Sequence, residues 1–112
     1  MPRFIFKNAS IEEVKELSQL LVEESSTIID CPEDWITFEY VDNHIFYKGE
    51  TITTNSLFLE ISWFKRSQET QDKLASYLYD TLNDYYKQKR EITLIFNQLL
   101  ESDYYEDGKN FS

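Results

Sequence analysis

The predicted order of strands and helices repeats once along this chain, and the repeat limits the possible folds more than any other feature. A strand, a helix and a second strand are expected in each half, at an offset of about 57 residues. Phe6 aligns with Phe64, and the strand around Phe38 aligns with the strand around Ile95, in pattern rather than in identity. Parallel strands joined by a helix need a right-handed crossover, so each half is predicted to be a right-handed βαβ unit.

The first half carries a signal for each of its elements. Phe4-Ile5-Phe6 is a short apolar run typical of a buried strand. Ser10 and Glu13 match a capping box, which predicts a helix that begins there, has one apolar face and ends before Pro32. Residues 36–40 alternate apolar and polar side chains, as a half-buried strand does.

The second half repeats these signals. Residues 57–64 are expected to form the longest strand, Ser67 is a candidate helix cap, and residues 91–96 should form the last main strand. Residues 45–50 predict a short hairpin arm between the halves, and Asp107-Gly108 predicts a late turn. The apolar face of the second helix is expected at Leu74, Leu78, Leu82 and Tyr85.

Together these elements predict one α+β domain over residues 1–112, with halves at 1–48 and 55–98 and a C-terminal segment at 99–112. Four main strands would form one mixed sheet with both helices on one face. The opposite face is then expected to be apolar, and further copies of the same chain are its simplest cover. A ferredoxin-like βαββαβ domain has a similar element order and stays open as an alternative.

Charge and composition exclude several classes of function. With 21 acidic and 11 basic residues, the net charge is −10, which repels nucleic-acid backbones and anionic membrane surfaces. A small anionic ligand remains compatible where the few cations gather. No apolar run approaches the ~20 residues that cross a bilayer, and the first residues lack the features of a signal peptide. A lone Cys31 cannot form an internal disulfide, so we expect a cytoplasmic protein.

Four short motifs have counterparts in known proteins. The start Pro2-Arg3-Phe4-Ile5 and the ending Lys109-Asn110-Phe111-Ser112 are similar to the two ends of macrophage migration inhibitory factor. Cys31-Pro32-Glu33-Asp34-Trp35 and Tyr104-Tyr105-Glu106-Asp107-Gly108 resemble motifs of a bacterial family of unknown function. Macrophage migration inhibitory factor and this bacterial family are both members of the tautomerase superfamily, which also includes 4-oxalocrotonate tautomerase and cis-3-chloroacrylic acid dehalogenase. The resemblance spans nearly the whole chain. It implies a homotrimer with pockets at subunit boundaries, and removal of the initiator methionine to leave an amino-terminal proline.

An amino-terminal Pro2 would carry a free secondary amine. Such a group has a pKa of roughly 7.7–8, and an apolar pocket or a nearby cation lowers that pKa because either one disfavours the protonated form. The neutral amine can then act as a general base at pH 7. Four aromatic residues are candidates for the pocket wall: Phe4, Trp35, Trp63 and Phe111. The alternative is a proline that only leads a strand.

Two arginines are candidates for binding a substrate carboxylate. Arg66 directly precedes the Ser67 cap, and a guanidinium can hold a carboxylate through two hydrogen bonds and stabilise a developing enolate. The resemblance to the dehalogenase also implies a substrate-binding arginine at this position. Arg3 follows the proline and would contribute if its strand borders the pocket. The alternative for each is a surface arginine, paired with an acid or solvated.

Glu106 is the third candidate catalytic residue, because it aligns with the dehalogenase glutamate that activates water. The alternative is a charged residue in an acidic tail. His44 is the only histidine and lies in an expected turn, which argues against a zinc site. Cys31 has no expected base partner, so we interpret it as structural. Neither a metal nor an organic cofactor is expected.

Two functional hypotheses follow. The first is a tautomerase for a small 2-oxo acid or its enol, in which Pro2 shuttles the proton, Arg66 binds the carboxylate, and Trp35, Trp63 and Phe111 shape the pocket. The second is a noncatalytic trimeric binding or assembly protein with the same fold. The resemblance does not specify a substrate, because Ile95 stands where the dehalogenase has a catalytic tyrosine.

Overall fold

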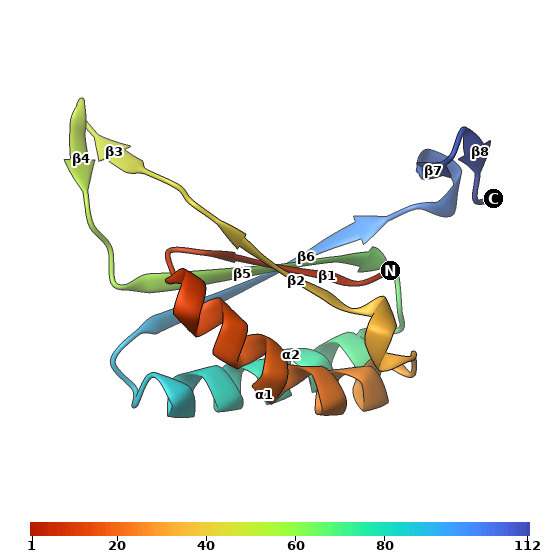
Figure 1. The fold of residues 1–112 in the computed structure, drawn as a ribbon, viewed down its shortest axis with the longest axis horizontal. Helices are drawn as coiled ribbons and strands as arrows, with labels where there is room; N and C mark the ends of the chain where they lie inside the picture. Colours follow the sequence, from red (N-terminus) through yellow and green to blue (C-terminus); the bar gives the residue numbers. More distant parts are fainter.

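Two βαβ units lie side by side and share one four-stranded sheet, with both helices on the same face (Figure 1). The computed structural model describes all 112 residues. The first unit comprises β1 (Arg3–Lys7), α1 (Ile11–Ile29), a short 3-10 helix η1 (Glu33–Trp35) and β2 (Thr37–Val41). The second comprises β5 (Ser56–Phe64), α2 (Gln68–Tyr85) and β6 (Glu91–Leu99).

The strand order confirms the predicted duplication. The sheet runs β2-β1-β5-β6, with β1 parallel to β2, β5 parallel to β6, and β1 antiparallel to β5. Each half therefore keeps its own two strands as neighbours. A ferredoxin-like sheet interleaves the strands of its two halves, so that alternative is wrong. No helix in the structure has the length and apolar character that a membrane crossing requires.

The core lies between the sheet and the two helices. Alternate residues of the central strands point at the helices, and they are fully buried: Phe4, Phe6, Leu57, Leu59, Ile61 and Trp63. The helices meet them with buried Leu17, Leu21, Leu74, Leu78 and Leu82. Burial of each such side chain stabilises the fold by about 1.5–3 kcal/mol. This core holds β1 and β5 antiparallel, so the start of β1 and the end of β5 lie at the same end of the sheet.

Both helices begin at the predicted serine caps. The Ser10 hydroxyl accepts a hydrogen bond from the Glu13 amide at 3.1 Å, and the Glu13 carboxylate accepts one from the Ser10 amide at 2.7 Å. The Ser67 hydroxyl accepts a hydrogen bond from the Thr70 amide at 3.1 Å. The second cap places the preceding Arg66 where β5 ends and α2 begins.

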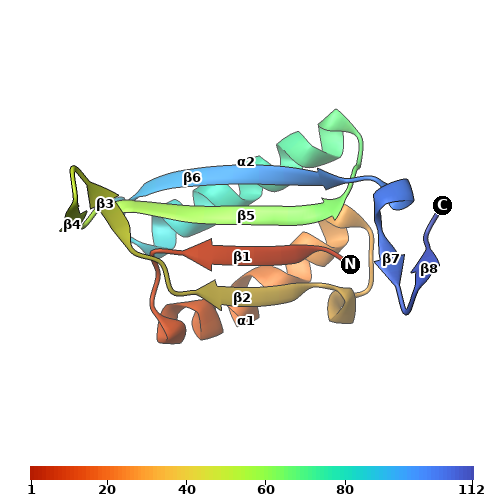
Figure 2. The ribbon, with the colours of Figure 1, turned by 90° about the horizontal axis from the view of Figure 1, so that it is seen from above.

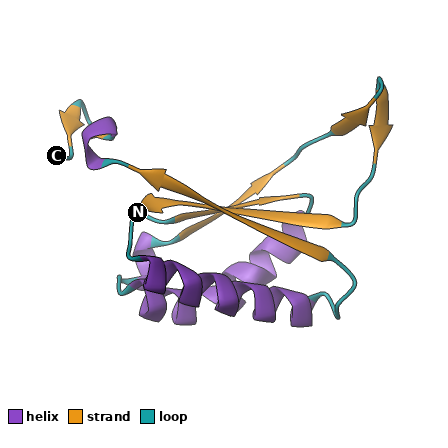
Figure 3. Ribbon diagram, turned by 180° about the vertical axis from the view of Figure 1, so that it is seen from behind, coloured by secondary structure: helices purple, strands orange, loops and turns teal.

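The sheet face opposite the helices is uncovered (Figure 3). The sequence predicted that this face is apolar, whereas it mixes apolar and charged side chains. Lys7 Nζ lies 2.7 Å from Glu60 Oε2, and Arg3 Nε lies 2.6 Å from Glu39 Oε2. Asn97 Nδ2 donates to Glu60 Oε1 at 3.4 Å. Because side chains alternate along a strand, the helices cover one apolar set, and the other face carries the charged residues interspersed with Ile5, Phe58 and Ile95.

Two small hairpins project from opposite ends of the sheet (Figure 2). At one end, β3 (Ile45–Tyr47) and β4 (Glu50–Ile52) form the predicted arm, which turns through Lys48 and Gly49 at φ 49° and 83°. Phe46 and Tyr47 on this arm are each 63% exposed. At the other end, a 3-10 turn η2 (Glu101–Asp103) leads into β7 (Tyr105–Glu106) and β8 (Lys109–Asn110). Both chain termini lie at this second end.

Candidate functional site

A pocket of about 430 Å³ opens at the end of the sheet where β1 begins and β5 ends. Its size falls within the range of small-molecule sites. Four apolar residues and three charged residues line it: Met1, Trp35, Phe64, Phe111, Arg66, Glu101 and Glu106. They come from both chain ends, from η1, and from the segments that follow β5 and β6.

An aromatic cluster attaches the C-terminal segment to the end of β5. The Phe64 ring lies 5.7 Å from the Phe111 ring and 5.1 Å from the Tyr104 ring, measured between centroids. The Phe111 amide donates to the Tyr104 carbonyl at 3.0 Å, which holds the two rings together. The cluster therefore forms a fixed apolar wall on one side of the pocket.

Arg66 is the only cation contributed to the pocket by a side chain, and it forms no salt bridge. Its Nη1 donates to the Phe64 carbonyl at 2.5 Å, and its Cζ lies 5.6 Å from the centroid of the Trp63 ring. The guanidinium is half-buried. In a chain with 21 acidic residues, a half-buried arginine without a carboxylate partner has donors free for an anionic ligand.

The amino terminus lies close to this arginine. Burial lowers the pKa of the Met1 amino group below its usual 8.0, and the Arg66 charge lowers it further, while Cys31 and Glu106 oppose the shift. Both main causes favour the neutral amine, which is the form that accepts a proton. Pro2 follows with its ring fully buried. While Met1 is attached, the Pro2 nitrogen is an amide and has no basic lone pair.

Cys31 lies near the same charges. Burial raises the pKa of its thiol, and the Arg66 charge opposes that rise only in part. The net shift favours the neutral thiol, so Cys31 is a poor nucleophile at pH 7. Nowhere does the structure bring three His, Cys, Asp or Glu side chains together as a metal site.

Comparison with known proteins identifies the family. Residues 1–110 match the family model described as "Domain of unknown function (DUF1904)". The chain belongs to the DUF1904 family. A crystal structure of a DUF1904 domain from Sebaldella termitidis is 35% identical, covers 99% of this chain and 100% of its own, and has a TM-score of 0.82. A protein of unknown function from Vibrio cholerae is 26% identical over 98% of this chain and 87% of its own, with a TM-score of 0.83.

More distant structures share this fold, and they include proteins of the kinds that the sequence motifs resemble. A fused 4-OT, described as an asymmetric trimer, has a TM-score of 0.75 at 13% identity over 96% of this chain and 94% of its own. A member of the cis-3-chloroacrylic acid dehalogenase family has a TM-score of 0.72 at 12% identity over 98% and 83%. Among curated proteins, none matches this chain.

In this DUF1904 chain the pocket gathers four of the residues singled out in the sequence: Trp35, Arg66, Glu106 and Phe111. Pro2 lies directly behind Met1, which lines the pocket. Phe4 is fully buried in the core. Trp63 is also fully buried, and its Nε1 donates to Gln98 Oε1 at 3.0 Å. Its ring packs under the Arg66 guanidinium and does not line the pocket.

Arg3 lies elsewhere. Its position in β1 alternates with the buried Pro2 and Phe4, so its side chain points to the uncovered face of the sheet. There it is 52% exposed and paired with Glu39. It does not line the pocket.

Besides Met1, which was expected to be removed, two lining residues were not among the candidates from the sequence: Phe64 and Glu101. Phe64 is the last residue of β5 and faces away from the helices, which the alternation along that strand does indicate. Glu101 begins a short 3-10 turn after β6, for which the sequence offers no periodic signal.

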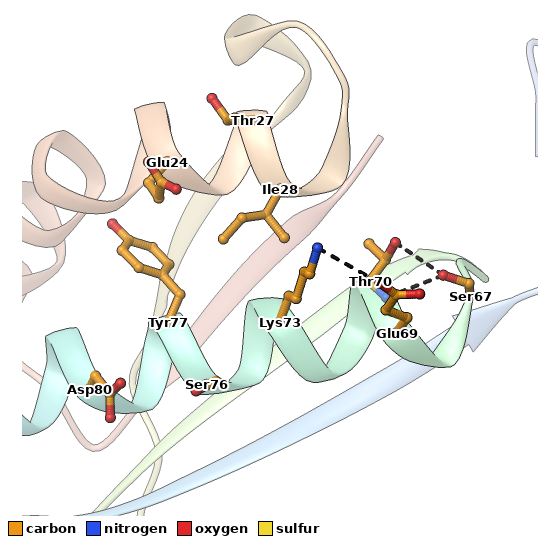
Figure 4. A pocket seen from close by; sticks show the side chains of 10 residues that line it. All are labelled: Glu24, Thr27, Ile28, Ser67, Glu69, Thr70, Lys73, Ser76, Tyr77 and Asp80. Carbon is orange, nitrogen blue, oxygen red and sulfur yellow. Dashed lines mark hydrogen bonds and ion pairs between the residues drawn. The ribbon is translucent and has the colours of Figure 1, made fainter.

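A larger groove of about 750 Å³ runs between α1 and α2 (Figure 4). It is a weaker candidate, because ten residues line it and only Ile28 and Tyr77 of these are apolar. Its one basic side chain, Lys73, lies 3.8 Å from Glu69. The acidic residues around it, Glu24 and Asp80 among them, would repel an anion.

Proposed function

We propose that this protein is a tautomerase for a small 2-oxo acid or its enol, and that it is active once Met1 has been removed. The observation that carries the proposal is the half-buried Arg66, free of any carboxylate, beside an amino terminus whose pKa is lowered. Pro2 directly follows Met1, which lines the pocket, so removal of Met1 would leave the free Pro2 amine at the edge of the pocket. The tautomerase-superfamily fold supports this reaction class.

The reaction needs only a proton to move. The neutral Pro2 amine takes the proton from the enol hydroxyl, and the resulting ammonium donates a proton to the double-bond carbon that does not bear the oxygen. The carbon–carbon double bond is thereby replaced by a carbon–oxygen double bond. Arg66 holds the substrate carboxylate and stabilises the negative charge that develops on the enolate oxygen. No redox partner is required, because no electrons leave the substrate.

Glu106 would tune the base in this scheme. Its charge raises the pKa of the Met1 amine, in opposition to Arg66, and we expect it to act in the same direction on the Pro2 amine. A carboxylate at this position also favours the ammonium form that must return the proton. We therefore assign Glu106 a positioning and tuning role.

We further propose that the protein is a homotrimer in the cytoplasm. One sheet face is uncovered, and an arm with exposed Phe46 and Tyr47 projects from one end of the molecule. An isolated two-stranded hairpin is marginally stable at best, so a neighbouring copy is its natural support. Light scattering after size-exclusion chromatography tests this, and a stable monomer would contradict it.

A noncatalytic trimeric binding or assembly protein is the second candidate. It is favoured if Met1 stays attached, because the Pro2 nitrogen then remains an amide. The intact mass of natively produced protein separates the two functions, since retention of Met1 rules out the proline base.

The direct test of catalysis uses phenylpyruvate, a 2-oxo acid with one carboxylate and an apolar body, as the enol substrate. Conversion to the keto form should fall about 100-fold in Pro2→Ala, which removes the secondary amine. Lys65→Gln is the matched control, because Lys65 is exposed and does not line the pocket. Equal rates for the wild type and Pro2→Ala would sink the proposal.

A further inference from the structure

The pocket contains more negative than positive side-chain charge. Against the single guanidinium of Arg66 stand the carboxylates of Glu101 and Glu106, and the remaining lining is apolar. The formal side-chain charge of the lining is therefore negative by one before any ligand enters.

The opposite charges come from different parts of the chain. Arg66 lies between β5 and α2, whereas Glu101 and Glu106 both belong to the segment that follows β6. No salt bridge joins Arg66 to either glutamate. The two carboxylates therefore do not neutralise Arg66 by direct pairing. Their negative charge acts on a ligand bound in the pocket.

We propose that the pocket selects 2-oxo acids with a single carboxylate and an apolar body, and rejects dicarboxylates of the same length. One carboxylate binds Arg66, and the body packs against Trp35, Phe64 and Phe111. A second carboxylate would find no second cation and would lie near Glu101 and Glu106. Like charges a few ångströms apart in a partly enclosed site disfavour binding by roughly tenfold or more. The 2-oxo acid class is taken from the proposed function, whereas the preference for one carboxylate follows from the charges that line the pocket.

The test compares 2-oxohexanoate with 2-oxoadipate, which have the same six-carbon chain and differ in whether it ends in a methyl or a carboxylate. Binding is followed by the fluorescence of Trp35, with Trp35→Phe identifying its signal. We expect 2-oxohexanoate to bind at least ~10-fold more tightly. In Glu101→Gln/Glu106→Gln the ratio should approach one, chiefly because 2-oxoadipate binds better. Both side chains are exposed, so the double variant should fold.

Salt supplies a second test on the unmodified protein, because ions screen the repulsion and should narrow the preference. Equal or tighter binding of 2-oxoadipate, an unchanged ratio in the double variant, or no binding of either acid would each overturn the selectivity. Turnover is measured separately. Selective binding without turnover would contradict the tautomerase proposal alone, and turnover without selectivity would contradict only this inference.

Discussion

The two ends of the β1–β5 seam occupy equivalent places in the duplicated fold, yet one is closed and the other is open. At the closed end, where β1 ends and β5 begins, Asn8 Nδ2 donates to the carbonyls of Thr54 and Ser56 at 2.9 and 2.7 Å. Arg90 donates to the carbonyls of Asn55, Asn8 and Ser56 at 3.1, 2.7 and 3.1 Å. The hollow nearby measures about 230 Å³, and no basic side chain lines it.

At the open end, Arg66 makes one hydrogen bond to a carbonyl and faces a pocket of about 430 Å³. Both arginines lie over an aromatic ring, Arg90 at 5.1 Å from Tyr86 and Arg66 at 5.6 Å from Trp63. Both arginines therefore stack on a ring, but Arg90 makes three hydrogen bonds to carbonyl groups and Arg66 makes one. The Arg90 guanidinium therefore joins three segments at the closed end, whereas the Arg66 guanidinium retains donors that no protein group uses.

The largest expected difference concerns activity. Arg66→Gln should lower kcat/KM for enol substrates about 100- to 1000-fold, because it removes a charge that stabilises the enolate. Arg90→Gln should leave kcat/KM within a factor of about three, once corrected for the folded fraction. Steady-state assays of the methionine-free protein provide the measurement. Equal losses in the two variants would erase the distinction between the ends.

Stability should show the opposite pattern. Arg90→Gln loses three hydrogen bonds to carbonyl groups and should lower the free energy of unfolding by about 2–3 kcal/mol. Arg66→Gln loses one and should cost under about 1 kcal/mol. Urea denaturation followed by circular dichroism measures both values. A larger loss for Arg66→Gln would mean that the open end is also structural.

The two helix caps allow a smaller test. Ser10→Ala breaks a reciprocal capping box and should destabilise the fold by about 1–2 kcal/mol. Ser67→Ala breaks a one-way cap and should cost about 1 kcal/mol or less. Only Ser67→Ala should also change kcat/KM, because Ser67 follows Arg66 directly. A change in kcat/KM for Ser10→Ala would contradict this assignment.

The smallest expected effect is on pH dependence. The pKa of the Met1 amine is lowered by burial and by the Arg66 charge. We expect the same direction for the Pro2 amine of the methionine-free protein, so kcat/KM should rise with pH through a value below the usual 8.0 as that amine loses its proton. Glu106→Gln removes a charge that raises this pKa and should move the rise to lower pH. Glu91→Gln at the closed end is the matched control, and it should leave the profile unchanged. A shift to higher pH in Glu106→Gln would reverse the assigned role.

Much of the fold could be predicted from local signals. The Ser10–Glu13 capping box, the alternation along residues 57–63 and the apolar face of α2 each depend on neighbours within a few residues, and the structure confirms them. The outer face of the sheet was predicted to be apolar, but it mixes apolar and charged side chains. Lys7 and Glu60 lie far apart in sequence, and only the pairing of β1 with β5 shows that they neutralise each other.

The pocket was predictable only in part, for a similar reason. Arg66 follows a strand and precedes a cap, so its place at the end of the sheet follows from the sequence. The alternation that buries Leu59 and Ile61 also buries Trp63, and it could have excluded that residue from the wall. Glu101 could not be predicted, because its place depends on how the segment after β6 turns back over the end of β5.

Both termini of the chain lie at the open end, and this governs how the protein should be handled in the laboratory (Figure 2). Met1 and Phe111 both line the pocket, so a peptide tag fused to either terminus would sit in or over it. Activity or ligand binding measured on such a fusion would reflect a pocket obstructed by the tag.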